Sequence, residues 1–597
     1  MHRRQLLAAG LAPMPWPSVG GVAPVASDGT LRVAFSAAES SLDPPQTNSS
    51  LYSTTVLAQI LESPLTYDYL ARPVRLMPCT AAAMPEVSAD GRRFVFRLQP
   101  GIFFADDPAF KGAKRELVAE DYVYSLKRYY DPRWKSSDLY LLENAKIIGM
   151  DEVRRKALAG APFDYDRVVP GLRSLDRYTF VVELGEPDPR FVYNFAGAGT
   201  FGAVAREVVE HYGDAIGEHP VGTGPFRLGA WRRASRIELL RSATHRGTPY
   251  AGTPAADPAA QAIAASLRGR RLPLADRVVV DIVEENQPRW LAFLNGQHDW
   301  LELPSNFAPM AMPGGQLAPY LSRRGIRAQR SLQADMIMHY FNMLDPVVGG
   351  YTPEKVALRR AVSLAYDNTR EIAQVRGGMA IPAQSTIAPH TSGYDPAYRS
   401  EMSEHSLPRA RALLDLYGYL DRNRDGWREL PDGTPFTLRI ATSADQVSRN
   451  LNELWKRALD AIGIRVQFEV STWPELLKKT RTASLQIWGY AWSAQSPDGG
   501  FFLAIAYGPN ADESNDARFA LPEFDRLFER QRRLPDGPER EALMRQAKDL
   551  LVAYMPYKAH AHRIMTDLMQ PWLRHWWRHP FMRNHWQYLE AQGRPAG

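Results

Sequence analysis

Apolar and polar residues alternate in several short segments, a pattern typical of β-strands that bury one face. The pattern covers residues 31–35, 94–98, 178–184 and 464–470. In the last segment the apolar face runs from Ile464 to Val470. These segments predict strands that are each buried on one face and exposed to solvent on the other.

Residues 451–462 instead carry apolar side chains at helical spacing, and Gly463 follows where a C-cap glycine is common. Strand patterns lie on both sides of this helix, at 436–440 and 464–470. A strand, helix and strand with short joints predict a βαβ unit, in which the two strands are parallel.

A second helix is predicted to start after Thr352 as N-cap, with Pro353 in its first turn. Residues 100–117, 242–275 and 300–320 show neither period and are predicted to be irregular. The second of these stretches is interpreted as a surface insertion. The whole pattern predicts a mixed α/β protein but does not reveal how many lobes it has.

The amino-acid composition excludes some classes of protein and site but does not indicate a particular function. The 597 residues are 45% hydrophobic and 23% charged, which is enough apolar chain for several cores. The net charge of +6 comes from mixed acidic and basic residues, so a nucleic-acid-binding stripe is not indicated. Cys79 is the single cysteine, which excludes an intrachain disulfide and a multi-cysteine zinc site.

Residues 1–26 resemble a secretory signal peptide. Arg3 and Arg4 precede an apolar stretch at 6–14 that is too short to span a bilayer. The arginine pair leaves open whether export uses the general or the twin-arginine route. Because no cysteine follows the apolar stretch, a lipoprotein is not expected. The mature protein is therefore expected to be soluble and periplasmic.

Catalytic motifs are absent from the sequence. It contains no Gly-x-Ser-x-Gly and no His-Glu-x-x-His. Gly197, Gly199 and Gly202 have the Gly-x-Gly-x-x-Gly spacing, but no strand pattern directly precedes them, so a dinucleotide-binding site is not indicated. The protein is therefore predicted not to be an enzyme. Members of a catalytic triad need not be adjacent in sequence, so an exported hydrolase stays as the weakest alternative.

Two segments carry residues that metals use. Residues 421–432 place Asp421, Asn423 and Asp425 at positions 1, 3 and 5 of an EF-hand-type calcium loop, with Asp432 at position 12. An acidic turn is the favoured interpretation, because Asp is shorter than the usual Glu at position 12 and no helix pattern follows. Five histidines lie between His560 and His585 among four tryptophans, and either haem or metal binding or simple packing fits them. Packing is favoured, and no metal or cofactor is predicted.

Several segments, taken together, resemble one family. They occur in the family's order at 86–101, 119–128, 220–226, 341–343, 352–365, 418–426 and 496–498. The most specific is the Pro-Val-Gly-Thr-Gly-Pro-Phe run at 220–226, where Gly222 and Gly224 are expected to permit backbone angles that other residues avoid. The chain is similar to the oligopeptide- and dipeptide-binding proteins (family 5) of ABC importers, which are extracytoplasmic solute-binding proteins.

That resemblance implies an α/β fold of the bilobal periplasmic-binding-protein type (Venus flytrap), with an extra α+β domain inserted into the first lobe. The expected division is a signal peptide at 1–26, lobe I at 27–65, 170–332 and 554–597, the inserted domain at 66–169, and lobe II at 333–553. The family mechanism is closure of the lobes around a ligand by a hinge.

The ligand-binding prediction centres on residues 486–500. A strand there puts Trp488, Tyr490 and Trp492 on one face, where they either line a cleft or pack in the lobe core. The strand leads into a Ser-Pro-Asp-Gly-Gly turn that contains Asp498. Asn342, in the matched segment 341–343, is also predicted to bind the ligand.

In the family, an aspartate in this segment anchors the α-ammonium group of the peptide. The equivalent position here falls on Ser493 or Gln495, and neither is charged. Asp498 is the nearest acid, in a turn-forming context. The sequence therefore leaves open whether a free N-terminus, a blocked peptide or another solute is recognised.

The resemblance implies a monomeric periplasmic component of an ABC transporter, which captures a peptide or peptide-like solute and passes it to permease subunits in the inner membrane. No nucleic-acid partner is expected. The alternative is a binding protein for a metal chelate or haem that uses the C-terminal histidines.

Overall fold

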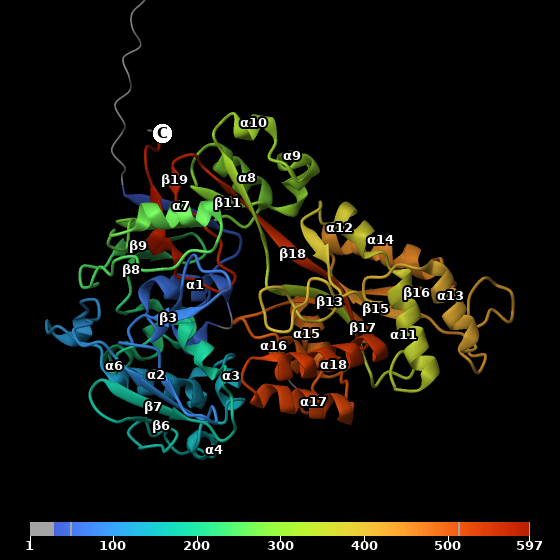
Figure 1. Ribbon diagram of the computed structural model, residues 1–597, viewed down its shortest axis with the longest axis horizontal. Helices are drawn as coiled ribbons and strands as arrows, with labels where there is room; N and C mark the ends of the chain where they lie inside the picture. The colour runs from blue at the N-terminus through green and yellow to red at the C-terminus, as the bar shows by residue number, and fades with distance from the viewer. Residues whose placement is uncertain (1–28, 48–49, 512–513, 596–597) are drawn as a thin grey trace, which may run out of the picture.

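The computed structural model describes residues 29–47, 50–511 and 514–595 (Figure 1). Residues 1–26, interpreted above as a signal peptide, lie outside this part. The four strand patterns are confirmed as β1 (Thr30–Phe35), β5 (Arg93–Arg97), β7 (Thr179–Glu183) and β16 (Val466–Val470). Among the described residues, no helix has the length and apolarity needed to cross a membrane.

Two four-stranded sheets share one hydrophobic core. The first has the order β1-β10-β9-β8, formed with β8 (Phe226–Arg232), β9 (Arg236–Arg241) and β10 (Arg277–Ile282). The second has the order β4-β5-β7-β6, with β4 (Glu86–Val87) and β6 (Leu172–Ser174). Helices α1 (Leu51–Ile60) and α2 (Ala119–Tyr130) contribute buried residues to the core that both sheets share.

An eight-stranded sheet extends from this half of the molecule into the other, since its β11 supplies Trp300 to the first core and its β13, β15 and β17 build the second. Its main order is β11-β18-β13-β17-β15-β16, with β12 and β14 also paired to β18. The new strands are β11 (Trp300–Glu302), β12 (Arg327–Leu332), β13 (Asp335–Phe341), β14 (Ala380–Pro382), β15 (Leu438–Thr442), β17 (Ile487–Ser493) and β18 (Tyr557–Met569). Helices α11 (Pro353–Ala365), α13 (Leu407–Leu416), α14 (Gln446–Asp460) and α18 (Pro538–Tyr554) add to its core.

The predicted βαβ unit is confirmed. Strands β15 and β16 are parallel, with Leu438 opposite Val466, and α14 connects them. The helix predicted after Thr352 is α11. The prediction that Val470 lies on the buried face of its strand was wrong, because its side chain is 61% exposed. It ends β16, which is the last strand of the sheet order and is therefore covered less than a central strand.

Strand β18 connects the two halves of the molecule (Figure 1). Its first residues, Tyr557 to Ala561, pair with β13, and its last, Ile564 to Met569, pair with β12. Asp335 begins β13 at the crossing point and accepts a hydrogen bond from the backbone N–H of Arg563 at 2.9 Å. The halves are thus joined by a continuous strand rather than by loops alone.

Two stretches predicted to be irregular contain regular structure. Residues 258–267 form α7 (Pro258–Leu267), whose N-cap Asp257 accepts hydrogen bonds from two backbone N–H groups. Alanine favours helices strongly even without an amphipathic pattern, which explains the miss. The stretch 300–320 contains β11 and the short helix α9 (Ala308–Ala311).

The glycines of the 220–226 segment serve a different purpose from the one expected. Neither Gly222 nor Gly224 has a positive φ. Instead the segment passes so close to α1 that a Cβ at Gly222 would lie 2.2 Å from the carbonyl oxygen of Ile60. The Gly224 N–H donates to that same oxygen at 2.8 Å. Absence of a side chain, rather than conformational freedom, is what the contact requires.

Substituting Gly222→Ala should therefore destabilise the fold by about 1–3 kcal/mol, because the obstructing atom belongs to backbone. Urea unfolding measures the change. The matched control is Gly197→Ala, where the nearest atom to an added Cβ is 3.5 Å away, and it should shift stability by less than about 1 kcal/mol. Equal stability of the two variants would contradict the packing explanation.

Candidate functional site: a cleft between the two halves

Three neighbouring cavities lie between the two halves of the molecule. The aromatic cavity, about 800 Å³, is lined on one side by Arg190 and Tyr193 and on the other by Trp492 and Phe501. The middle cavity, about 360 Å³, shares Tyr193 and Phe501 with it. Since each wall comes from a different half, the cavities form one cleft.

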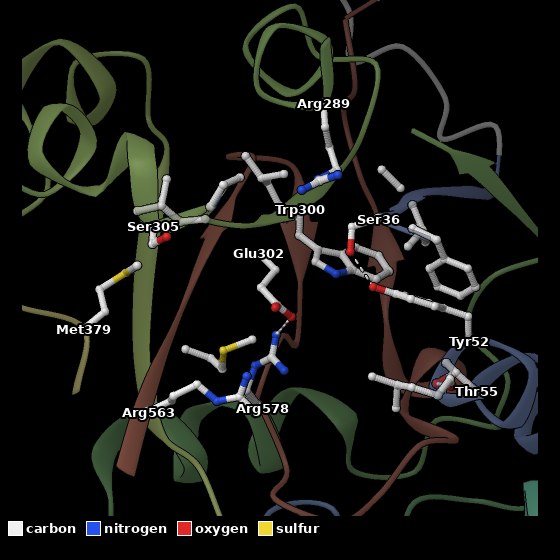
Figure 2. A pocket seen from close by; sticks show the side chains of 18 of the residues that line it. Ser36, Tyr52, Thr55, Arg289, Trp300, Glu302, Ser305, Met379, Arg563 and Arg578 are labelled. Carbon is white, nitrogen blue, oxygen red and sulfur yellow. Dashed lines mark hydrogen bonds and ion pairs between the residues drawn. The ribbon is translucent and has the colours of Figure 1, made fainter. Parts of the chain in front are cut away.

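The arginine cavity, about 460 Å³, lies at the other end of the cleft, beside β18. It shares Leu51 and Arg583 with the middle cavity. Figure 2 shows Arg563 and Arg578 next to each other near Glu302, with Arg289 entering from another wall. Sequence reasoning missed this part of the site, because its side chains come from segments far apart in the chain.

Strand β17 supplies the aromatic residues that were predicted to bind ligand. Its alternation places Trp488, Tyr490 and Trp492 on one face, with successive ring centroids 4.9 and 6.5 Å apart. Trp488 is 2% exposed and packs against Trp473 at 5.1 Å. Trp492, two positions further along, lines the aromatic cavity and contacts Phe501 at 5.2 Å.

Tyr490 and Asn342 are engaged within the protein. The Tyr490 hydroxyl donates to Asp516, and burial together with that carboxylate raises the pKa of Tyr490. Asn342 is 4% exposed, and its side-chain amide donates to the carbonyl oxygens of Ala483 at 2.8 Å and Leu485 at 3.0 Å. The Asn342 amide thus holds the chain that enters β17.

Ser493 and Gln495 both line the middle cavity. They lie where β17 ends, so they project into the space between the halves. Gln495 is hydrogen-bonded to the side chain of Tyr140 across the cleft. This stretch of the wall offers polar but uncharged groups.

Asp498 lines the aromatic cavity but is already paired with two arginines. Arg540, which is 1% exposed, forms an ion pair with it, and the Nε of Arg190 lies 3.3 Å from its Oδ2. Burial alone would raise the pKa of Asp498, but attraction to both arginines lowers it. Arg190 also donates to the carbonyl oxygens of Leu534, at 2.7 Å, and Arg532. Arg190 therefore bridges the two walls of the cleft.

Four of the five C-terminal histidines, His560, His562, His575 and His579, are buried and hydrogen-bonded. His560 donates from Nδ1 to Glu371 at 2.9 Å and lies 2.9 Å from His339. The Nδ1 of His562 donates to the carbonyl oxygen of Asp335 at 2.6 Å. Across the described ranges, no cluster of three His, Cys, Asp or Glu side chains has metal-binding geometry.

The acidic loop at 421–432 uses its oxygens to shape a turn. The Asp421 carboxylate accepts hydrogen bonds from the backbone N–H groups of Asp425 at 3.1 Å and Gly426 at 3.0 Å. Asp425 forms an ion pair with Arg465 at 2.6 Å. These contacts fit the turn interpretation of the loop.

Two joined α/β halves with a cleft between them define a solute-binding protein of the two-lobed type. The description "Bacterial extracellular solute-binding proteins, family 5 Middle" matches residues 75–514. The chain belongs to this family, as its sequence motifs indicated.

Individual relatives cover nearly the whole chain. "Di/tripeptide-binding protein 2" of Pseudomonas aeruginosa is 25% identical over 90% of this chain and 90% of its own. "Heme-binding protein A" of Haemophilus influenzae is 22% identical over 83% of this chain and 81% of its own. The solved structure of the Helicobacter pylori periplasmic binding protein DppA with the peptide STSA has a TM-score of 0.70 and 20% identity, covering 95% of this chain and 99% of that one. The bilobal fold is confirmed.

Replacing Arg190 by Ala should open the cleft. The bridge between the walls is lost, while Arg540 still compensates the charge of Asp498, so the fold is retained. Small-angle scattering of the ligand-free protein should show a larger radius of gyration. Arg133→Ala is the control, because Arg133 pairs with Asp214 on one side only. Unchanged scattering from the Arg190 variant would show that the bridge does not restrain the halves.

The arginine cavity also predicts a pH dependence. Burial, then Arg578 and Arg583, lower the pKa of His585 from 6.5 to about 3. Between these values the unfolded chain binds a proton that the folded chain does not, so stability falls as the pH drops below 6.5. At pH 5 this group alone should cost about 2 kcal/mol. Urea unfolding at pH 7 and pH 5 should show a smaller loss for His585→Gln than for the unmodified protein, and equal losses would refute the assignment.

Proposed function

We propose that this chain is the periplasmic binding component of an ABC importer and that it captures a peptide or peptide-like solute in the cleft. The family and the names of its relatives support this proposal. The observation that carries it is a cleft whose two walls come from different halves, joined along strand β18 and the consecutive strands β12 and β13. Closure would enclose the solute and present both halves to the permease.

The residues divide by role. We assign ligand contact to Trp492, Ser493 and Gln495, which line the cleft at the end of β17. Trp488 and Tyr490 support that strand from the protein interior. Because Gln495 and Ser493 are uncharged, main-chain and neutral polar contacts would hold this part of the solute rather than a carboxylate on its ammonium group.

The domain division given above remains a proposal. The sheets supply one relevant fact: β7 pairs with β5 along five residue pairs, from Arg93 opposite Glu183 to Arg97 opposite Thr179. Segment 172–183 therefore shares a sheet with segment 86–97. The inserted domain is best defined with these strands included.

The haem alternative has weaker support. One relative is named for haem binding. The alternative depended on the C-terminal histidines, yet His560 and His562 are each 1% exposed and hydrogen-bonded within the protein. We propose binding without bond breakage, as in a family of solute-binding proteins.

Thermal unfolding with a peptide library, set against haem and a nickel chelate, tests the proposal. A solute that binds the native fold raises its melting temperature. Peptides should raise it and haem should not. Shifts produced by haem or nickel alone would replace the peptide proposal with the chelate alternative.

Trp492→Ala should weaken peptide binding at least about fivefold, since a cleft aromatic contributes about 1 kcal/mol beyond its buried area. Calorimetric titration measures the affinity. The ligand-free melting temperature should change little, because the ring lines a cavity. Trp427→Ala, in the 421–432 turn, is the matched control and should bind normally. Unfolding of the Trp492 variant would instead place that ring in the core.

A further inference from the structure

The arginine cavity concentrates positive charge in one part of the cleft. The guanidinium groups that line it belong to Arg289, Arg376, Arg563, Arg578 and Arg583. Among the described lining residues, Glu302 supplies the one carboxylate. Tryptophan and aliphatic side chains make up much of the remaining wall, so the charges lie in surroundings less polar than water.

Three of these arginines are neutralised by carboxylates behind the wall. The pairs are Arg376 with Glu371 at 2.5 Å, Arg563 with Asp335 at 2.5 Å, and Arg578 with Asp567 at 2.5 Å and Glu302 at 3.2 Å. These pairs fix the geometry of the wall and account for every carboxylate in it.

The other two arginines have no carboxylate partner. Arg289 is 6% exposed and donates to backbone carbonyl oxygens of Val283 at 2.6 Å and Glu284 at 3.0 Å. Arg583 is exposed to the cavity, and its guanidinium makes neither a hydrogen bond nor an ion pair with any residue in the described part of the chain. Surrounding protein atoms and Arg578 lower the pKa of Arg583 to about 10.

Neighbouring groups respond to the same positive field. Burial and then Arg578 and Arg583 lower the pKa of His585, and burial with several cations, Arg583 among them, lowers that of His579. Both imidazoles stay neutral near pH 7, so they add no charge of their own. The Arg583 guanidinium faces the cavity without a protein counter-ion, and its planar fork matches carboxylate and phosphate oxygens.

We infer that the arginine cavity binds an oxyanion of the solute, a carboxylate or a phosphate group, with Arg583 as its principal contact. Arg583 lines both the arginine cavity and the middle cavity, which Gln495 also lines. A solute extending along the cleft can place an apolar part at Trp492, a neutral part at Gln495 and its anionic end at Arg583. The inference rests on the proposed function only in taking this cleft as the binding site.

The first test uses inorganic phosphate, which needs no knowledge of the natural solute. Phosphate should raise the melting temperature of the full-length protein more than chloride does at equal ionic strength. Arg583→Gln should reduce that difference to the general stabilisation that phosphate gives any protein, and Arg583→Lys, which keeps the charge, should retain part of the additional shift. Arg268→Gln removes an exposed arginine outside the cavity and should behave like the unmodified protein.

A phosphate effect equally large in Arg583→Gln and in the unmodified protein, or one no larger than that of chloride, would overturn the inference. Because Arg583 has no partner within the described protein, its replacement should leave the ligand-free melting temperature nearly unchanged. Circular dichroism of each variant confirms that the fold is intact before ligands are compared.

The second test separates the sources of the oxyanion. Peptides with a free C-terminal carboxylate, their C-terminal amides, and amides carrying a phosphoserine are compared by calorimetric titration. If the site binds a carboxylate, peptides with a free C-terminal carboxylate should bind about 10- to 100-fold more tightly than their C-terminal amides. If it binds a phosphate group, the phosphoserine amides should bind more tightly than the plain amides by the same factor. Arg583→Gln should remove whichever preference is found. Equal binding of all three kinds of peptide would support the peptide-binding function and refute the oxyanion site. Phosphate binding without any peptide binding would support the oxyanion site and refute the peptide-binding function.

Discussion

The cleft depends on one strand that is hydrogen-bonded to both halves of the molecule. Strand β18 pairs with β13 through its first residues and with β12 through its last, and the bulge in its β13 pairing lies at the junction. A shared strand keeps the two halves in register while allowing them to rotate about its centre. The ion pair between Arg563 and Asp335 sits at that centre and also forms part of the cavity wall. Arg563 therefore belongs both to the junction between the halves and to the proposed binding site.

Charge is distributed unevenly along the cleft. At the aromatic end, the carboxylate of Asp498 is matched by Arg190 and Arg540, which leaves ring faces and neutral groups for a solute. At the β18 end, cations exceed the available carboxylates. A cleft with this polarity would orient an elongated solute by electrostatics before any side chain of the solute is recognised, since charge complementarity fixes register more than it adds affinity.

Much of the fold could be predicted because it follows local periodicity. The βαβ unit around α14 and the helix after Thr352 are properties of short segments, and both are confirmed. The site could be predicted only in part. Trp492 lies on β17 and Gln495 follows shortly after the strand ends, so their placement is local, but the arginines that pair with Asp498 come from distant segments. Likewise Gly222 was correctly singled out for the wrong reason, because its neighbour Ile60 belongs to a helix far away in sequence. Whether an arginine is paired or free is a tertiary property, which is why Arg583 carried no signal in the sequence.

An unpaired cation in the cleft also bears on how closure is controlled. Closing the empty protein would draw Arg583 further from water without a counter-ion, which opposes closure. A bound oxyanion supplies that counter-ion and becomes more strongly attracted as water is excluded. The solute then stabilises the closed state through differential affinity, which is the only way a ligand can shift such an equilibrium. The bridge from Arg190 acts in the opposite sense, because it holds the walls together whether or not a solute is present. How far the empty protein stays open would therefore depend on two opposing contributions: the bridge from Arg190, which favours closure, and the unpaired charge of Arg583, which opposes it.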